Sequence, residues 1–203
     1  MVEYLPSKQN VAGSNPVFRY SFNCNRGIVQ KNVIDDYKEW ETIKIKEDLD
    51  RKAFPYSIMM QHIQGDFNIS TFIRNGNAFG VKEIFYYGRK KWDRRGAVGT
   101  HNYKQLTHLD SFEEIQALKD KYTLVAVENT LESSISINDF KLKENLLFIF
   151  GEEMLGISKE VLDICDYSVH INQYGSVRSL NVGTASGIIM QHVSSYFSKM
   201  RDK

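Results

Sequence analysis

The sequence predicts an α/β protein whose parallel sheet is covered by helices on both faces. From Pro55 onward, short apolar runs rich in β-branched and aromatic residues alternate with segments of helical periodicity. The runs are apolar throughout, as expected of strands that are buried on both faces. Polar and glycine-containing segments follow several of the runs, at the strand ends where open α/β sheets bind their ligands.

Residues 1–50 are expected to form an arm or extension, and residues 51–203 one globular domain. The arm is rich in Asn, Ser and Lys and has weak periodicity, which predicts a partly irregular chain with a short strand at residues 17–22. Near its end, residues 37–49 mix apolar and charged side chains and predict a helix that ends before Pro55.

Five apolar runs in the larger domain have the length and composition of buried strands. They occupy residues 56–60, 83–87, 123–128, 145–150 and 167–171. In the last run His170 alternates with Val169 and Ile171, which places its side chain on the opposite face of that strand.

Four segments between and after the strands predict helices. They are residues 68–79, residues 111–121, a short helix from residue 158, and residues 180–196. Asn68 is predicted to cap the first helix, and Ser111 with Glu114 forms a capping box for the second. The predicted apolar face of the last helix consists of Val182, Ala185, Ile188, Ile189 and Val193.

The composition excludes several classes of protein. The 203 residues carry a net charge of +1 and are 42% hydrophobic, which is typical of a globular protein. No apolar run approaches the roughly 20 residues that span a bilayer, and the N-terminus lacks the pattern of a secretory signal. Neither Cys24, nor Cys165 in its apolar stretch, nor the histidines have the spacing of metal ligands. We therefore expect a cytoplasmic protein with no membrane segment, disulfide or metal.

A basic segment lies at residues 88–96, directly after the second predicted strand. It places five cations around Trp92 and Asp93, namely Arg89, Lys90, Lys91, Arg94 and Arg95. A basic segment with an aromatic ring can neutralise phosphates and stack on a base, which makes it a candidate nucleic-acid contact. A solvated charged loop is the other interpretation of the same residues.

Four polar segments are candidates for the functional site. They occupy residues 65–74, 127–130, 151–156 and 172–181. None contains the dinucleotide fingerprint or the phosphate-binding loop, which argues against a nucleotide-binding oxidoreductase. Taken singly, Asn68 and Arg74 are explained by helix capping and by the edge of the apolar core.

Taken together, three of these segments resemble the ordered motifs of the SPOUT, TrmH-like RNA 2'-O-methyltransferases. The first motif is Asn-Ile-Ser-Thr-Phe-Ile-Arg at residues 68–74, followed by Ala-Phe-Gly at residues 78–80. The second is residues 151–157, and the third is residues 173–182, which read Gln-Tyr-Gly-Ser-Val-Arg-Ser-Leu-Asn-Val. The resemblance covers roughly residues 55–197 in the order and spacing of the family.

The resemblance implies a C-terminal trefoil knot, a homodimer with the active site near the subunit interface, and S-adenosyl-L-methionine held in the knotted loops. The cofactor-binding residues that it implies are Gly151, Ile171, Leu180, Val127 and Glu128. The positions that it associates with catalysis and substrate placement are Arg74, Asn68, Glu153, Ser179 and Asn181. Contacts with RNA are expected from Arg89, Lys90, Lys91, Arg94, Arg95 and Arg178.

These residue types suit methyl transfer. A sulfonium methyl group is already activated, so the enzyme has to place it in line and assist loss of the ribose proton. Glycine at positions 151, 156 and 175 lets main-chain groups approach a cofactor closely. The family's arginine is often proposed as a general base, but a guanidinium pKa above about 12 makes its deprotonation costly. We expect Arg74 instead to hold the adjacent phosphate and stabilise the developing alkoxide.

The function predicted on this basis is methylation of a ribose 2'-hydroxyl in structured tRNA or rRNA. The alternative is a catalytically silent RNA-binding module that retains the knotted fold as a scaffold. The presence of all five implied catalytic residues argues against the alternative, because a silent descendant has no reason to keep them.

Overall fold

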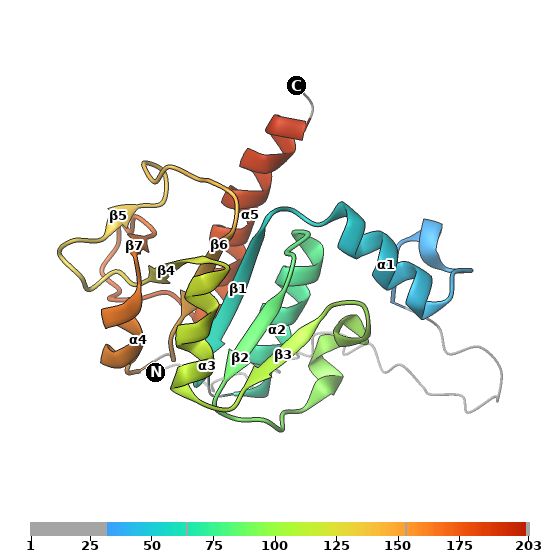
Figure 1. The fold of residues 1–203 in the computed structure, drawn as a ribbon, viewed down its shortest axis with the longest axis horizontal. Helices are drawn as coiled ribbons and strands as arrows, with labels where there is room; N and C mark the ends of the chain where they lie inside the picture. Colours follow the sequence, from blue (N-terminus) through green and yellow to red (C-terminus); the bar gives the residue numbers. More distant parts are fainter. Residues whose placement is uncertain (1–31, 64, 153, 202–203) are drawn as a thin grey trace, which may run out of the picture. The chain divides into compact units, whose positions relative to one another are not determined.

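The computed structural model describes residues 32–63, 65–152 and 154–201. In this part of the chain seven strands form one sheet in the order β3-β2-β1-β6-β4-β7-β5 (Figure 1). Every pair of neighbouring strands is parallel, which confirms the predicted fold class. The strand predicted at residues 17–22 and Cys24 both lie outside the described residues, and the knot stays a prediction.

The sheet contains all five strands that were predicted in the larger domain, each confirmed to within one residue at either end. The strands are β1 (Tyr56–Gln61), β2 (Ile84–Tyr87), β3 (Leu106–Leu109), β4 (Thr123–Val127), β5 (Ile135–Ser136), β6 (Leu146–Phe150) and β7 (Tyr167–His170). Strands β3 and β5 were not predicted, because both are short edge strands that lack a run of buried apolar residues.

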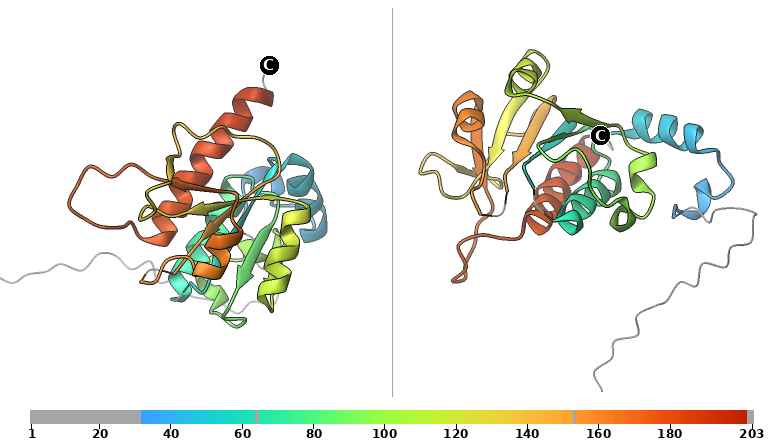
Figure 2. Two further views of the ribbon diagram at one scale, coloured as in Figure 1. Left: turned by 60° about the vertical axis from the view of Figure 1, so that its left-hand side comes forward. Right: turned by 90° about the horizontal axis from the view of Figure 1, so that it is seen from below.

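Helices cover both faces of the sheet, as Figure 2 shows in its right-hand view. The α-helices are α1 (Thr42–Lys52), α2 (Asp66–Ala78), α3 (Phe112–Ala117), α4 (Lys159–Ile164) and α5 (Val182–Arg201). Within the described residues four 3-10 helices accompany them, η1 (Asp35–Tyr37), η2 (Arg94–Ala97), η3 (Thr100–Asn102) and η4 (Leu118–Asp120). None of the helices in the described part of the chain is long and apolar enough to cross a membrane.

Two apolar cores separate the sheet from its helices. On one face, Ile73 of α2 and Ile189 of α5 belong to a core that includes the side chains of β1 and β6. On the other face, Ile115 of α3 and Val161 of α4 pack on alternate residues of the same strands. All five residues of β6 are buried, because this strand lies in the middle of the sheet between both layers.

The first two helices begin at other residues than the sequence predicts. Helix α1 starts at Thr42, because Tyr37 instead ends the short helix η1 and packs into a small separate core with α1. Helix α2 starts at Asp66, and its N-cap is Gly65 with a φ of 71°. Asn68 therefore lies inside the first turn of α2 instead of capping it, and its side chain contacts α5, as described below.

The capping box predicted for α3 forms in a modified way. Ser111 is the N-cap residue, as expected, but its side chain makes no capping hydrogen bond. The Glu114 carboxylate accepts the backbone N–H of Asp110 at 2.7 Å, one residue before the predicted partner. The regular helix ends at Ala117, and η4 continues the turn toward the predicted end.

The apolar face of α5 is confirmed except at one position. The buried or half-buried members of the predicted face are Val182, Ala185, Ile189 and Val193. Ile188 is 40% exposed, which corrects its assignment to this face. Ser186 and Met190 are fully buried instead, because they lie closer to the line of contact between α5 and the sheet.

Cys165 is the residue that follows α4, at the end of the predicted apolar stretch. It is half-buried, and its thiol lies 3.1 Å from the carbonyl oxygen of Val161. Burial raises the pKa of this thiol to about 12, so Cys165 is protonated at neutral pH and acts as a packing residue.

A buried carboxylate fastens α1 to the preceding short helix. Asp48 is only 3% exposed, and it accepts a hydrogen bond from the Tyr37 hydroxyl at 2.6 Å. Lys52 and Arg51, one turn further along α1, both form ion pairs with the same carboxylate. The hydrogen bonds from Lys52 and Tyr37 hold the pKa of Asp48 well below its usual range.

We expect an Asp48→Asn variant to be less stable than the wild type at neutral pH, and the difference to narrow as the pH falls below about 4. The folded-state pKa of Asp48 is depressed, so its contribution is complete above the ordinary pKa of 3.8 and declines as pH falls below that value. Urea denaturation of both proteins between pH 6 and pH 3 measures the difference in unfolding free energy. A difference that stays constant over this range would contradict the assignment.

Candidate functional site

A cavity of about 250 Å³ lies at the carboxyl ends of β4, β6 and β7. The three strands are neighbours in the order β6-β4-β7, and Val127 pairs in register with Phe150 on one side and Val169 on the other. Their carboxyl ends therefore meet at one edge of the sheet, and the segments that follow them enclose the cavity. The five residues implied to bind a cofactor all line it: Val127, Glu128, Gly151, Ile171 and Leu180.

Glycine is required in the segment that follows β6. A Cβ atom on Gly151 would lie 2.1 Å from the carbonyl carbon of Gly156, so no side chain fits there. Gly156 has a φ of 69°, a backbone conformation that favours glycine, and it forms an antiparallel bridge with Glu152. Gly175 corrects the expectation of a third close approach, because a Cβ atom there would meet nothing within 4 Å.

Glu128, the residue after β4, presents an oriented carboxylate to the cavity. Its Oε1 atom accepts the backbone N–H groups of Asn129 and Thr130 at 3.0 and 3.3 Å, and the Thr130 hydroxyl at 3.1 Å. A Cβ atom on Gly156 would lie 2.6 Å from Oε2 of Glu128, so the carboxylate is held against the glycine segment. Across the described residues, no group of three His, Cys, Asp or Glu side chains could hold a metal ion.

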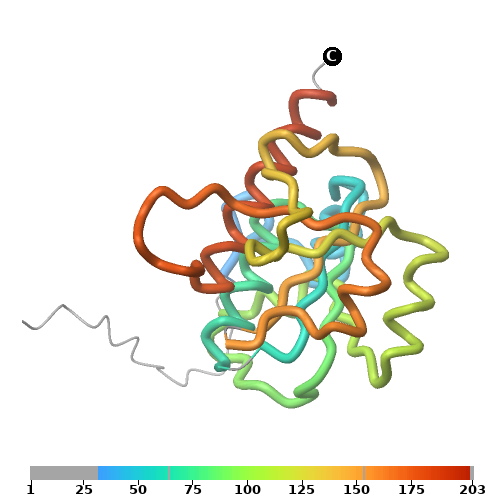
Figure 3. The backbone as a smooth tube through the Cα atoms, turned by 90° about the vertical axis from the view of Figure 1, so that its left-hand side faces the viewer, coloured from blue at the N-terminus to red at the C-terminus, as the bar shows by residue number. Residues whose placement is uncertain are grey.

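The loop from β7 to α5 forms another wall of the cavity. It is the orange-to-red loop that stands out from the fold in Figure 3. The side-chain amide of Asn129 donates to the carbonyl oxygen of Arg178 at 2.8 Å and so ties this loop to the segment after β4. Arg178, Ser179 and Leu180 all line the cavity.

Two of the implied catalytic residues meet where α5 begins. The side-chain amide of Asn181 donates to Oδ1 of Asn68 at 3.0 Å, which joins α5 to the first turn of α2. Oδ1 of Asn181 accepts the N–H groups of Gly183 at 2.9 Å and of Thr184 at 3.3 Å, so the same side chain caps α5. Both chain neighbours of Asn181 line the cavity, which places the asparagine pair at its rim.

We expect Asn181→Ala to destabilise the protein by about 1 kcal/mol, because the variant loses the cap of α5. Asn181→Asp keeps a capping oxygen but has no amide to donate to Asn68, so it should retain most of the stability and still lose the link between the helices. Thermal denaturation of the two variants separates these roles. Equal destabilisation by both substitutions would show that the cap is not the main contribution of this side chain.

Arg74 is exposed on α2 and does not line the cavity. It follows Asn68 by six residues, so at about 100° per residue the two side chains leave α2 about 120° apart. Asn75, the next residue, faces α5 and donates to the carbonyl oxygen of Gly183 at 3.0 Å. Arg74 is therefore exposed to solvent outside the cavity. Glu153 lies outside the described residues.

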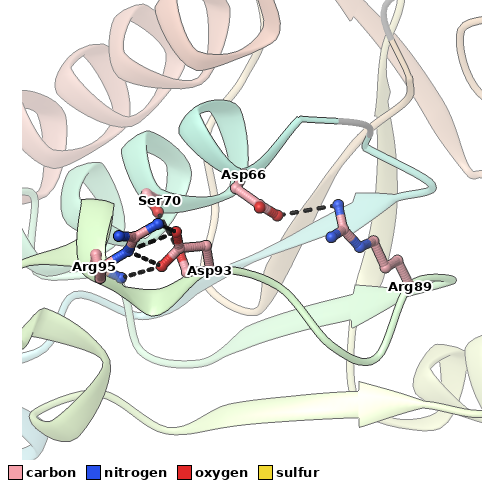
Figure 4. Close-up of polar contacts among 5 residues, drawn as sticks. All are labelled: Asp66, Ser70, Arg89, Asp93 and Arg95. Carbon is pink, nitrogen blue, oxygen red and sulfur yellow. Dashed lines mark hydrogen bonds and ion pairs between the residues drawn. The ribbon is translucent and has the colours of Figure 1, made fainter.

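Two arginines of the basic segment at residues 88–96 are held by carboxylates near the start of α2 (Figure 4). Arg89 forms an ion pair with Asp66, in the first turn of α2, at 3.0 Å. Nε of Arg95 donates to Oδ2 of Asp93 at 2.8 Å, and this contact lowers the pKa of Asp93 to about 2. The Ser70 hydroxyl of α2 donates to the backbone carbonyl of Asp93 at 3.4 Å, which fixes the segment against the helix.

The other three cations of the segment differ in their surroundings. The ammonium nitrogen of Lys90 lies 3.4 Å from Oδ1 of Asp110, within ion-pair distance. Lys91 and Arg94 are exposed, and in the described part of the chain neither forms an ion pair with a carboxylate. The Arg94 guanidinium instead lies 6.0 Å from the centre of the Trp92 ring. The segment is therefore less positive than its composition indicates, and its free charge is concentrated at Lys91 and Arg94.

The cavity includes two polar residues to which the sequence analysis assigned no role in the site, His170 and Gln173. His170 is a residue of β7, as predicted, but its side chain borders the cavity, and Nδ1 lies 3.2 Å from the Ser134 hydroxyl. Oε1 of Gln173 is buried and has no hydrogen-bond partner among the described residues. Alternation along a strand indicates which face a residue occupies, but it does not indicate that a cavity borders that face.

A parallel sheet with a loop-lined cavity at its strand ends defines a ligand-binding α/β protein. Residues 55–191 match the SpoU rRNA Methylase family, which is about two thirds of the 203 residues. The chain belongs to this family. It is thus an RNA methyltransferase.

Several curated relatives are named tRNA (guanosine(18)-2'-O)-methyltransferase. The protein from Aquifex aeolicus is 24% identical over 152 residues, which are 72% of this chain and 72% of the relative. That from Borreliella burgdorferi is 26% identical over 169 residues, 81% of this chain and 75% of the relative. That from Escherichia coli K12 is 25% identical over 151 residues, 72% of this chain and 66% of the relative.

Solved structures share the fold. The A. aeolicus TrmH/SpoU tRNA modifying enzyme matches with a TM-score of 0.70 at 22% identity, over 78% of this chain and 83% of that one. The SpoU methyltransferase AviRb from Streptomyces viridochromogenes, in complex with the cofactor AdoMet, matches with a TM-score of 0.64 at 21% identity. The second match covers 70% of this chain and 57% of AviRb.

Proposed function

We propose that this protein transfers the methyl group of S-adenosylmethionine to a ribose 2'-hydroxyl of tRNA. The observation that carries the proposal is a cavity walled by a close-packed glycine segment, with the Asn68–Asn181 pair of two separate helices at its rim. The names of the relatives support both the ribose hydroxyl as acceptor and tRNA as substrate.

The residues of the cavity fit the cofactor. The segment at Gly151 leaves main-chain groups accessible where any side chain would collide, and Ile171 and Leu180 offer apolar surface. The fixed Glu128 carboxylate can accept hydrogen bonds from hydroxyl or ammonium groups. The buried Oε1 of Gln173 has no hydrogen-bond donor among the described residues, and a ligand could supply one. When bound, the cofactor supplies a methyl group activated by its positively charged sulfur.

The remaining polar residues are assigned to the RNA. Ser179 lines the cavity, and Asn181 and Asn68 form a pair at its rim; these side chains are assigned to hydrogen bonds with the ribose that presents its 2'-hydroxyl. Arg74 holds the adjacent phosphate and stabilises the developing alkoxide, since a guanidinium stays protonated and presents planar, paired donors. Glu153 is assigned to the same machinery from its motif position.

A homodimer belongs to the same proposal. Large apolar side chains are exposed on the two loops that border the cavity: Met154 is 92% exposed, Leu155 83%, Tyr174 93% and Val177 62%. A second copy of the chain would cover this apolar surface beside the cavity. Light scattering after size exclusion should then give twice the chain mass of 23.5 kDa. We assign the protein to the cytoplasm, where its tRNA substrate is available.

Methyl transfer tests the proposal directly. The purified protein is incubated with methyl-labelled S-adenosylmethionine and unmodified tRNA, and the digested RNA is analysed by mass spectrometry. The expected product is one 2'-O-methylated nucleoside at a single position. Label on a base instead of a ribose, or no label with any tRNA or rRNA, would overturn the proposal.

The silent RNA-binding module predicts a different result. Such a protein would bind RNA but transfer no methyl group, and calorimetry would detect no S-adenosylmethionine binding. The asparagine pair and Ser179 support the enzyme instead, because a scaffold has no need of these polar groups beside a cavity.

A further inference from the structure

A second cavity lies at the other end of the strand order, beside β2 and β3. Its volume is about 520 Å³, within the range of roughly 300–1,000 Å³ that is typical of ligand pockets. Its lining comes from α1, β2, the basic segment, η3 and the start of β3. The cofactor cavity lies beyond α2 and β1, so the two cavities share no lining residue.

Three cations and no carboxylate line this cavity. The cations are Lys46 of α1, Arg94 of the basic segment and Lys104, which directly precedes β3. Lys104 is only 3% exposed, and its ammonium donates one hydrogen bond, to the carbonyl oxygen of Val81 at 2.7 Å. In the described part of the chain no carboxylate forms an ion pair with Lys104; burial lowers its pKa, and the charge of Asp50 offsets part of this effect. A buried ammonium with spare donors favours an anionic ligand.

Aromatic rings stand beside these cations. Trp92 and His101 both line the cavity, with ring centroids 6.0 Å apart and planes at 86°. Nδ1 of His101 is buried and has no hydrogen-bond partner among the described residues. The Arg94 guanidinium lies over the Trp92 ring. Aromatic faces beside cations are the combination that binds single-stranded nucleic acid, in which bases stack and phosphates pair with charges.

We propose that this second cavity binds a nucleotide of the RNA, with the base against Trp92 and the phosphate on Lys46, Arg94 and Lys104. The inference rests on the proposed function in that the RNA is the methylation substrate. Three strand spacings of about 4.8 Å, about 14 Å in all, separate β2 beside this cavity from β4 beside the cofactor cavity. At about 3.4 Å per stacked nucleotide, four or more nucleotides span this distance.

Trp92 provides a direct measurement. The chain has two tryptophans, and a Trp40→Phe background leaves Trp92 as the sole fluorophore. Titration with a short single-stranded oligoadenylate should quench its fluorescence. Lys46→Gln should weaken this binding about tenfold and lower the slope of log K against log salt by about 0.7, since one phosphate contact is lost.

Lys44→Gln is the matched control. Lys44 is exposed on the same helix, and residues two apart on a helix do not share a face. It should leave both the affinity and the salt slope unchanged. Equal effects of the Lys44 and Lys46 substitutions would show that the overall positive charge attracts the RNA and that Lys46 makes no specific contact, which would overturn the proposal.

Two further experiments distinguish a site for RNA from a site for a free nucleotide, and this proposal from the proposed function. Adenosine monophosphate should quench Trp92 more weakly than the oligoadenylate; equal or tighter binding would identify a free-nucleotide site and overturn the assignment to RNA. If the oligoadenylate does not quench Trp92 in a protein that transfers methyl groups normally, only the assignment of the second cavity is refuted. Quenching that persists in a protein that transfers no methyl group would refute the proposed activity alone.

Discussion

Replacing Arg74 by alanine should lower the rate of methyl transfer at saturating tRNA by about 100- to 1,000-fold. This is the usual effect of removing one preorganised donor that stabilises charge in the transition state. The affinity for S-adenosylmethionine should stay unchanged, because Arg74 does not line the cofactor cavity. Single-turnover transfer of labelled methyl groups and calorimetry measure the two quantities separately.

The nature of the substitution decides what Arg74 does. Arg74→Lys keeps the charge but loses the planar pair of donors, so we expect it to remain strongly impaired. Lys82→Ala removes an exposed cation just beyond α2 and should have little effect. Near-normal turnover of Arg74→Lys would exclude a bidentate grip on the phosphate.

Gly151→Ala should weaken S-adenosylmethionine binding by about 10- to 100-fold or more. Its Cβ atom would lie 2.1 Å from the carbonyl carbon of Gly156 and 2.3 Å from the backbone nitrogen of Ile157. Main-chain atoms cannot rotate out of the way, so the wall of the cavity must shift, and overpacking of this kind costs about 1–3 kcal/mol. Calorimetry measures the affinity, and circular dichroism reports whether the fold is kept.

Gly175→Ala is the control within the same group of loops. A methyl group there would meet open space, and Gly175 has no positive φ, so cofactor affinity should match the wild type. Should Gly151→Ala bind the cofactor normally, the close-packed segment after β6 could not be the wall against which the cofactor rests.

The sequence predicted the sheet interior better than its edges and caps. A strand buried on both faces, such as β6, consists of consecutive apolar residues, and this run is easily recognised in the sequence. Strand β5 has only two residues, which is too short for any recognisable alternation or apolar run. The start of α2 was misplaced because Asn68 is a good capping residue, whereas Gly65, the actual N-cap with a φ of 71°, has no side chain that could signal a cap. Ile188 was misplaced because periodicity alone does not locate the centre of a helical face.

The site was predictable only as far as motifs and strand ends reveal it. Val127, Gly151 and Ile171 follow or end strands, so their meeting at one sheet edge follows from parallel pairing. The hydrogen bond between Asn68 and Asn181 joins residues 113 positions apart, and no local pattern indicates it. The pairing of Arg89 with Asp66 was hidden for the same reason, and the basic segment therefore looked more positive than it is.

The place of β6 between β1 and β4 has a consequence for biosynthesis. Tyr56 of β1 pairs with Leu146 of β6, and Thr123 of β4 pairs with the same residue from the other side. While the ribosome is still translating codons before Leu146, β1 and β4 of the nascent polypeptide therefore each have one side whose backbone N–H and C=O groups are unpaired. Unpaired strand sides of this kind can pair with strands of other molecules and so lead to aggregation. Protection by chaperones is most needed in that interval, and messages truncated there should yield insoluble products.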